Sequence, residues 1–191
     1  MPTQTRRERA REERRTLILR AARDLAEAEG WDAVTTRRLA EAVDYSQPVL
    51  YGHFKNMNAI ADAVALEGIE ELTEVFRTAR SSSAGDTAGL RALAHAYLDF
   101  AEQHPAVYEA MFVRRTDLVF GAADTPPELT DAFNQIRAAV EPFTSDDPET
   151  LTEVFWSALH GIATLTDGHR LRPTHRQARL DTLVSRFIGN K

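Results

Sequence analysis

Apolar residues recur every three to four positions along almost the whole chain, with polar and charged residues between them. This spacing is typical of helices that bury one face, and the strict alternation that marks a strand does not extend over any useful length. Prolines and glycines separate most of the apolar stretches and indicate where helices begin and end. The pattern predicts an all-α protein with helices over residues 14–29, 36–43, 47–54, 57–80, 87–103, 105–113, 127–140, 148–168 and 174–188.

The first three predicted helices are short and follow one another closely. Gly30 is placed to end the first helix, and Thr35 and Ser46 are placed to cap the second and the third. Pro48 falls in the first turn of the third helix, where its missing N–H is not needed. Asp44 lies in the turn before that helix and tolerates the left-handed conformation. We therefore expect a compact three-helix module, joined by a long helix to a larger helical module.

The net charge of −6 at first argues against a nucleic-acid partner, because phosphate binding depends on Lys and Arg. The charge is unevenly distributed, however. Residues 1–23 contain eight arginines and three acidic residues, a net charge of +5, which leaves −11 for the remainder of the chain. A basic end on an acidic body is a known sign of a nucleic-acid-binding arm, although a solvated, partly helical arginine-rich segment without a partner would look the same.

Several classes of site are excluded by composition. The chain has no cysteine, so disulfides, thiolate metal sites and cysteine nucleophiles are impossible. Its histidines have no tight ligand spacing, and we expect neither a metal nor a cofactor. No apolar run reaches the roughly 18 to 20 residues of a membrane span, and the first residues do not form a secretion signal. The sequence is therefore expected to be that of a cytoplasmic protein without a membrane partner.

Two segments around the turn between the second and third helices carry the most specific signal. Residues 35–40 read Thr-Thr-Arg-Arg-Leu-Ala, and residues 46–56 read Ser-Gln-Pro-Val-Leu-Tyr-Gly-His-Phe-Lys-Asn. Over about residues 17–66 the chain resembles the DNA-binding region of the TetR family. The resemblance implies a helix-turn-helix whose second helix enters the major groove. The expected organisation is a flexible basic arm at 1–13, a helix-turn-helix domain at 14–57 and a helical regulatory and dimerisation domain at 58–191.

The residue types in this motif suit DNA recognition. Gln47 at the start of the third helix can pair bidentately with adenine, and Arg37 can pair with guanine. The others offer apolar surface to a thymine methyl or hydrogen bonds to phosphates. Tyr51 could instead be a packing residue, and Arg37 or His53 could be merely solvated. The candidate DNA-binding residues are Thr35, Thr36, Arg37, Gln47, Pro48, Val49, Tyr51, His53 and Lys55.

The motif departs from the usual family pattern at several positions. Asp44 replaces a glycine in the turn, and Met57 replaces a lysine just after the recognition helix. Val49 and Gly52 also differ from the common residues. These departures bear on affinity and operator sequence rather than on the binding mode. The arginines at 6–15 could compensate by reaching the DNA backbone or the minor groove.

The second half of the chain resembles a C-terminal domain found in part of the TetR family and marked by a Trp, a His and a Gly, here Trp156, His160 and Gly161. That resemblance implies a helical regulatory domain whose small-molecule ligand differs between members. Aromatic residues with a few polar groups suit a mostly apolar ligand, although each of them could be ordinary core. The candidate ligand-binding residues are Tyr97, Phe100, His104, Tyr108, Met111, Phe112, Phe133, Trp156 and His160.

The last two predicted helices carry apolar stripes, and the family pairs its last two long helices across a two-fold axis. Such a dimer would place two recognition helices on two half-sites. The same stripes could equally belong to the core of one chain. The candidate dimer-interface residues are Phe155, Leu159, Ile162, Leu183, Val184 and Phe187.

The sequence therefore predicts a DNA-binding transcriptional regulator, expected to be a homodimeric repressor that a small apolar ligand releases from a palindromic operator. One alternative is a helical enzyme that uses Asp99, Glu102, His104 or His160 in acid–base chemistry, although nothing pairs these residues into a catalytic set. Another alternative is a dimeric scaffold without DNA contact. The operator, the effector, the controlled genes and the sign of regulation are not encoded in any motif.

Overall fold

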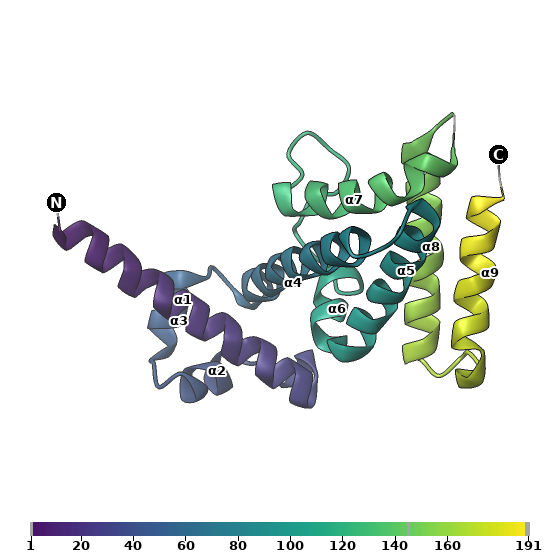
Figure 1. The fold of residues 1–191 in the computed structure, drawn as a ribbon. Helices are drawn as coiled ribbons and strands as arrows, with labels where there is room; N and C mark the ends of the chain where they lie inside the picture. The colour runs from purple at the N-terminus through teal and green to yellow at the C-terminus, as the bar shows by residue number, and fades with distance from the viewer. Residues whose placement is uncertain (1, 145, 190–191) are drawn as a thin grey trace. The chain divides into compact units, whose positions relative to one another are not determined.

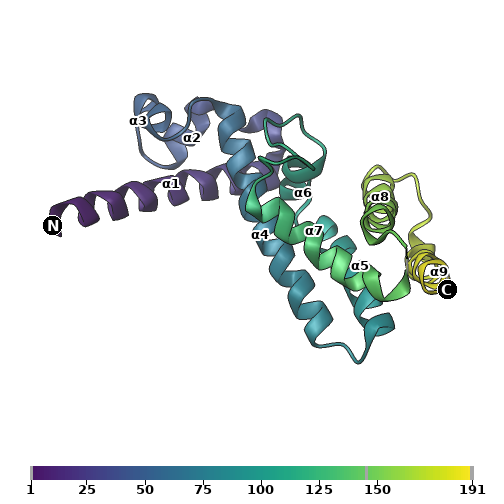
Figure 2. The same ribbon diagram turned by 90° about the horizontal axis from the view of Figure 1, so that it is seen from above.

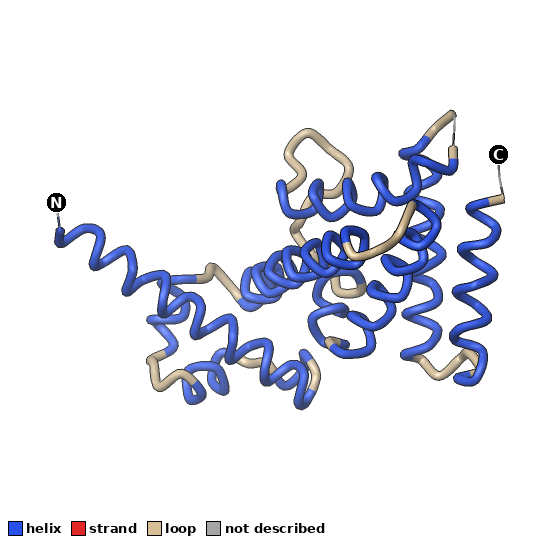
Figure 3. Tube along the Cα trace, in the orientation of Figure 1, coloured by secondary structure: helices blue, strands red, loops and turns tan. Residues whose placement is uncertain are grey.

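The computed structural model describes residues 2–144 and 146–189, and their regular secondary structure is helical (Figure 3). This confirms the predicted all-α class. Short 3-10 turns lie at Trp31–Ala33, Glu141–Phe143 and Pro173–His175. The α-helices, labelled in Figure 1, are α1 (Pro2–Glu29), α2 (Thr36–Ala42), α3 (Gln47–His53), α4 (Met57–Ser81), α5 (Asp86–Gln103), α6 (Pro105–Phe112), α7 (Pro127–Val140), α8 (Pro148–Asp167) and α9 (Arg176–Ile188).

Helix α1 begins much earlier than the sequence pattern predicts. Residues 2–13, expected to be a flexible arm, are helical, and only Met1 of that arm lies outside the described residues. The arm lacks apolar periodicity, but it is rich in Arg and Glu, which are good helix formers. Glu12 and Arg15, three residues apart, also form an ion pair at 3.7 Å. Helix propensity and local charge pairs therefore extend the helix where burial cannot.

The chain folds into two packing units. The N-terminal unit comprises Met1–Gly68 together with His104–Leu118, and the C-terminal unit comprises Ile69–Gln103 together with Val119–Lys191. This division differs from the one expected after residue 57. The first turns of α4 and the whole of α6 belong to the same unit as the helix-turn-helix, and α4 runs from one unit into the other.

Within the N-terminal unit, α6 is docked on α1 and on the turn that follows it. The indole Nε1 of Trp31 donates a hydrogen bond to the backbone oxygen of Ala106 at 2.8 Å. The Glu27 carboxylate accepts hydrogen bonds from the backbone nitrogens of Ala106 and Val107, at 3.1 and 3.2 Å. These nitrogens belong to the first turn of α6, where backbone donors have no partner inside the helix. Glu27 of α1 thus caps α6, and Trp31 adds a further hydrogen bond to the same turn.

Gly68 permits a close approach between α4 and α6. A Cβ atom at this position would lie 2.3 Å from Cγ1 of Val107 and 2.9 Å from the sulfur of Met111. The two helices can pack at this distance only because residue 68 has no side chain.

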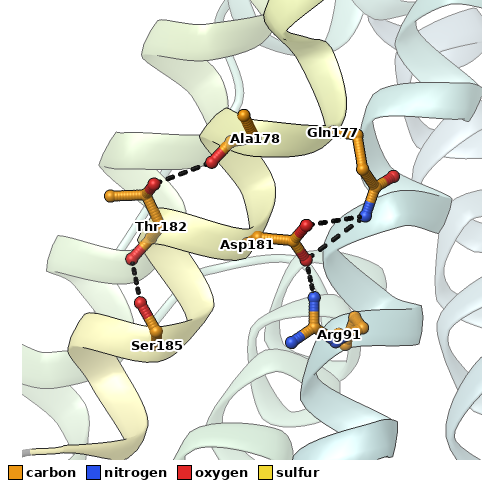
Figure 4. Close-up of polar contacts among 6 residues, drawn as sticks. All are labelled: Arg91, Gln177, Ala178, Asp181, Thr182 and Ser185. Carbon is orange, nitrogen blue, oxygen red and sulfur yellow. Dashed lines mark hydrogen bonds and ion pairs between the residues drawn. The ribbon is translucent and has the colours of Figure 1, made fainter.

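In the C-terminal unit, α5 contacts α7, α8 and α9 and supplies much of the core. Leu90, Leu93 and Tyr97 of α5 are at most 1% exposed. At the edge of this core, Asp181 of α9 accepts hydrogen bonds from Arg91 of α5 and from Gln177, the latter at 3.2 Å (Figure 4). Polar contacts therefore fix α9 beside α5 where the apolar contacts end.

Candidate nucleic-acid interface

The turn between α2 and α3 has the geometry of a helix-turn-helix. Asp44 adopts a φ of 54°, which is the left-handed conformation that the sequence predicts this residue to tolerate. Thr35 caps α2, because its hydroxyl accepts a hydrogen bond from the backbone nitrogen of Arg38 at 3.3 Å. Ser46 occupies the N-cap position of α3, but its side chain makes no capping hydrogen bond, contrary to the prediction. The first turn of α3 therefore has no side-chain cap, and Leu50 is the first residue of this helix that is buried.

Apolar side chains fix α2 and α3 against α1. Leu39 of α2 is completely buried, and Leu50 of α3 is 2% exposed. Val43 and Phe54, at the ends of these helices, are buried as well, at 6% exposure each. These residues belong to the core, and they leave the opposite side of both helices in solvent.

The predicted DNA-contact residues lie mainly on that outer side. Gln47 and Pro48 are exposed at the start of α3, and Tyr51 is 53% exposed, which argues against a role in packing alone. The hydroxyl groups of Tyr51 and Thr36 are 3.2 Å apart and join α3 to α2. Exposed residues also include Thr35, Arg37 and Lys55, whereas Thr36, Val49 and His53 are half-buried.

Two ion pairs organise the arginines of α2. Arg37 donates from Nε to the Glu41 carboxylate at 2.9 Å, and its side chain remains 81% exposed. Arg38 donates two hydrogen bonds to the Glu29 carboxylate, at 2.5 and 2.8 Å, and these bonds lower the pKa of Glu29. The pair between Arg38 and Glu29 joins α2 to the end of α1 and so helps to orient the helix-turn-helix. The sequence pattern did not reveal it, since nothing in the pattern shows that residues 29 and 38 meet.

Positive charge gathers at the end of α3. Desolvation lowers the pKa of His53, and the charges of Arg11, Arg14 and Arg15 lower it further. The lowered pKa favours the neutral form of the His53 imidazole, which can donate or accept a hydrogen bond but carries no positive charge. Lys55 lies 3.6 Å from the Asp117 carboxylate.

The candidate ligand-binding residues divide between the two units. In the C-terminal unit, Trp156 donates from Nε1 to the Tyr97 hydroxyl at 3.2 Å, and the ring of Phe76 stacks on Tyr97 with centroids 6.2 Å apart. Phe76, which is fully buried, could not be singled out from the sequence because an apolar residue at helical spacing does not stand out. This unit also contains Phe100, Phe133 and His160, whereas His104, Tyr108, Met111 and Phe112 belong to the N-terminal unit.

Most of the candidate dimer-interface residues are core residues of a single chain. Phe155, Leu159 and Val184 are completely buried, and Phe187 is 9% exposed and packs edge-on against the Phe155 ring. A side chain already buried in one chain has little surface left to bury against a second chain, so the burial of these four residues favours the intramolecular interpretation. Ile162 and Leu183 are half-buried. Larger apolar exposure on α8 belongs to Val154 (53%) and Leu165 (41%).

Neither a metal site nor a membrane span is found within the described part of the chain. No group of three or more His, Asp or Glu side chains there is arranged to hold a metal ion. Among the helices at 2–144 and 146–189, none combines the length and the apolar character that crossing a membrane requires.

A tight turn, a buried inner face and an exposed polar outer face define α2 and α3 as a helix-turn-helix, a DNA-binding unit. The family described as "Bacterial regulatory proteins, tetR family" matches residues 18–64, and the family described as "Tetracyclin repressor-like, C-terminal domain" matches residues 90–188. The chain belongs to the TetR family of transcriptional regulators. It is therefore a DNA-binding transcriptional regulator.

Individual relatives agree with this assignment. The uncharacterized HTH-type transcriptional regulator YobS of Bacillus subtilis is 34% identical over 107 residues, which cover 54% of this chain and 56% of YobS. The class A tetracycline repressor of Escherichia coli is 50% identical over 48 residues, 25% of this chain and 22% of that protein. The chain thus spans little more than half the length of the first of these relatives and less than a quarter of the second.

The fold also matches solved structures. A TetR from Acinetobacter baumannii, solved in complex with minocycline, superimposes with a TM-score of 0.64 over 89% of this chain and 93% of the other, at 21% sequence identity. At that level of identity the likeness concerns the fold.

Proposed function

We propose that the protein is a homodimeric repressor, that it binds a palindromic operator through α2 and α3, and that a small, mostly apolar ligand releases it. The observation that supports the proposal most strongly is the exposure of Gln47, Tyr51 and Arg37 on the helix-turn-helix. Membership of the TetR family supplies the context in which this surface acts.

In the proposed complex, base recognition belongs to Gln47 and Arg37. Gln47 is exposed in the first turn of α3, and N-terminal residues of a recognition helix face the base edges. Its amide matches the N6 and N7 atoms of adenine, and the free end of the Arg37 guanidinium matches O6 and N7 of guanine. Pro48 and Val49 offer apolar surface to a thymine methyl group.

The phosphate contacts are assigned to the residues around these two. Thr35, Thr36 and Tyr51 present hydroxyl groups, His53 an imidazole and Lys55 an ammonium group. Such contacts set the position of the protein on the duplex and carry no sequence information directly. Substituting one of them should weaken binding to all sequences alike, whereas substituting Gln47 should act at particular base pairs.

Two copies of the chain are needed to read a palindrome, because half-sites lie about 34 Å apart on one face of the duplex. The exposed apolar residues of α8, Val154 and Leu165, are the better candidates for the two-fold contact. Ile162 and Leu183 are half-buried and can contribute their remaining surface. The proposed dimer predicts that Val154→Glu produces monomers in sedimentation analysis and weakens operator binding.

The proposed ligand binds near the aromatic side chains of the C-terminal unit, such as Tyr97 and Trp156. Minocycline in the Acinetobacter relative shows that a protein of this fold accepts a small molecule. A bound effector changes DNA affinity only if it favours one conformation over the other. Helix α4 is continuous between the two units, and α6 is joined by the chain to the C-terminal unit on both sides, so both can transmit the change.

The proposal is tested by selecting DNA that binds the full chain from a random pool. We expect a palindrome with two equal half-sites. On that operator, Gln47→Ala should lose about 1 to 3 kcal/mol of discrimination at particular bases in salt-controlled gel shifts. A pool without enrichment would instead favour the scaffold alternative. Screening small aromatic molecules for release of the operator tests the ligand, and failure of every one would remove the switching part.

A further inference from the structure

The N-terminal half of α1 carries a row of arginines on one side. Arg7, Arg11 and Arg14 are exposed and are separated by four and three residues, so they lie on the same side of the helix. One and two turns further, this side bears Ile18 and Ala22, both completely buried in the N-terminal unit. The side of α1 that is buried at Ile18 and Ala22 therefore continues toward the N-terminus as an exposed row of positive charges.

The opposite side of α1 has a different character. A surface groove there is lined by both signs of charge together with Leu17, and its residues are Arg9, Glu12, Glu13, Thr16, Leu17 and Arg20. Two arginines and two glutamates balance one another in this groove. The positive charge of the segment is therefore concentrated on the side of Arg7, Arg11 and Arg14, although the sequence alone shows only a net excess.

The arginine row approaches the end of the recognition helix. The neighbouring Arg15 places its guanidinium 5.5 Å from the centre of the Phe54 ring, immediately after α3. Arg11 and Arg14 are close enough to His53 to contribute to the lowering of its pKa. In both ribbon views the N-terminal turns of α1 extend past α2 and α3 (Figures 1 and 2).

We propose that Arg7, Arg11 and Arg14 bind the phosphate backbone of DNA on the flank of the half-site that α3 reads. This inference rests on the proposed function, since it requires the recognition helix to lie in the major groove. Arginine suits the partner, because its planar fork binds phosphate oxygens bidentately. An arm that is already helical also loses less conformational entropy on binding than a flexible arm of the same composition.

The test compares two double variants of the full chain that remove equal charge from opposite sides of α1. R11Q/R14Q changes the arginine row, and R9Q/R20Q changes the balanced groove. Each is titrated at several salt concentrations against the selected palindrome, once with long flanks and once trimmed to the half-sites. Circular dichroism melting establishes that both variants are folded, and R11K/R14K is included because it preserves the charge.

On the long duplex we expect R11Q/R14Q to bind at least about tenfold more weakly than R9Q/R20Q. The slope of log K against log salt should become shallower by about 0.9 for each phosphate that the variant no longer neutralises. R11K/R14K should recover most of the affinity, and trimming the flanks should remove the difference between the two glutamine variants. Equal binding by both, or a difference that persists on the trimmed duplex, would overturn the inference.

Gln47→Ala is measured on the same duplexes to separate base recognition from the flanking contact. Reduced base discrimination in Gln47→Ala with equal binding by the two arginine variants would remove the flanking contact and leave the proposed function standing. Unchanged discrimination in Gln47→Ala would remove Gln47 as a base-reading residue, whereas a random pool without an enriched palindrome would remove the proposed function and the flanking contact together.

Discussion

The Nε atom of Arg37 donates a hydrogen bond to Oε1 of Glu41, one turn later in α2, at 2.9 Å. This contact occupies the inner edge of the guanidinium and leaves its two terminal nitrogens in solvent. The terminal nitrogens are the atoms that can bind O6 and N7 of guanine together. In the proposed complex, Glu41 would therefore position the guanidinium of Arg37 for the base.

Glu41→Ala should relax recognition of the guanine without abolishing binding. Arg37 would sample more rotamers, and the roughly 1 to 3 kcal/mol of discrimination that a bidentate pair provides would be reduced. Affinity for unrelated DNA should rise, because a negative charge is removed near phosphates. Competition between the operator and a variant changed at the guanine measures both effects. Unaltered discrimination would contradict the positioning role.

Asp117→Asn should strengthen DNA binding. Asp117 lies 3.6 Å from the Lys55 ammonium, and both side chains are more than 70% exposed, so the pair adds little stability. The carboxylate nevertheless competes with phosphate for the same lysine. We expect tighter operator binding, with a salt slope steeper by up to about 0.9 per subunit. The control is Asp32→Asn, an exposed acid of the same unit, and an equal gain there would reduce the effect to net charge.

Gly68→Ala and Gly161→Ala should change stability in opposite directions. A methyl group at 68 would meet Val107 at 2.3 Å, and overpacking of this kind typically costs about 1 to 3 kcal/mol. At 161 a Cβ atom has no neighbour within 4 Å, so alanine should stabilise α8 by up to about 1 kcal/mol. Urea unfolding of both variants gives the comparison. Stabilisation at 68 would show that α4 and α6 do not approach so closely.

Stability should fall as the pH drops below 6.5, in part through His160. Burial lowers the pKa of His160 below its ordinary value of 6.5, so the unfolded chain binds the proton more readily than the folded one. The folded state therefore loses stability from about pH 6.5 down to the lowered pKa, and no further loss from this group follows below it. His160→Gln should lose less stability than the parent protein between pH 7.5 and 5.5 in urea unfolding. A loss of stability in His160→Gln equal to that of the parent protein would contradict this role of His160.

Sequence reasoning located the helices of the core well because each of them buries an apolar stripe. The predicted ranges 105–113, 127–140 and 148–168 differ from α6, α7 and α8 by no more than one residue at either end. It failed at α1, where the first turns are held by propensity and charge and have no stripe to detect. The outer residues of α2 and α3 could be predicted because a known motif assigns their direction.

The amino-acid sequence by itself determines the helix-turn-helix, because the turn residues, the helical period and the polar outer residues all depend on neighbours within a few positions along the chain. Tertiary structure alone decided that Phe155 and Leu159 are core residues and that Glu27 and Trp31 hold a helix that begins at residue 105. Tertiary structure also decided that Arg7, Arg11 and Arg14 lie on the same side of α1 as the buried residues Ile18 and Ala22. Each of these depends on which face of a helix meets which distant neighbour, and a periodic pattern specifies a face without specifying its partner.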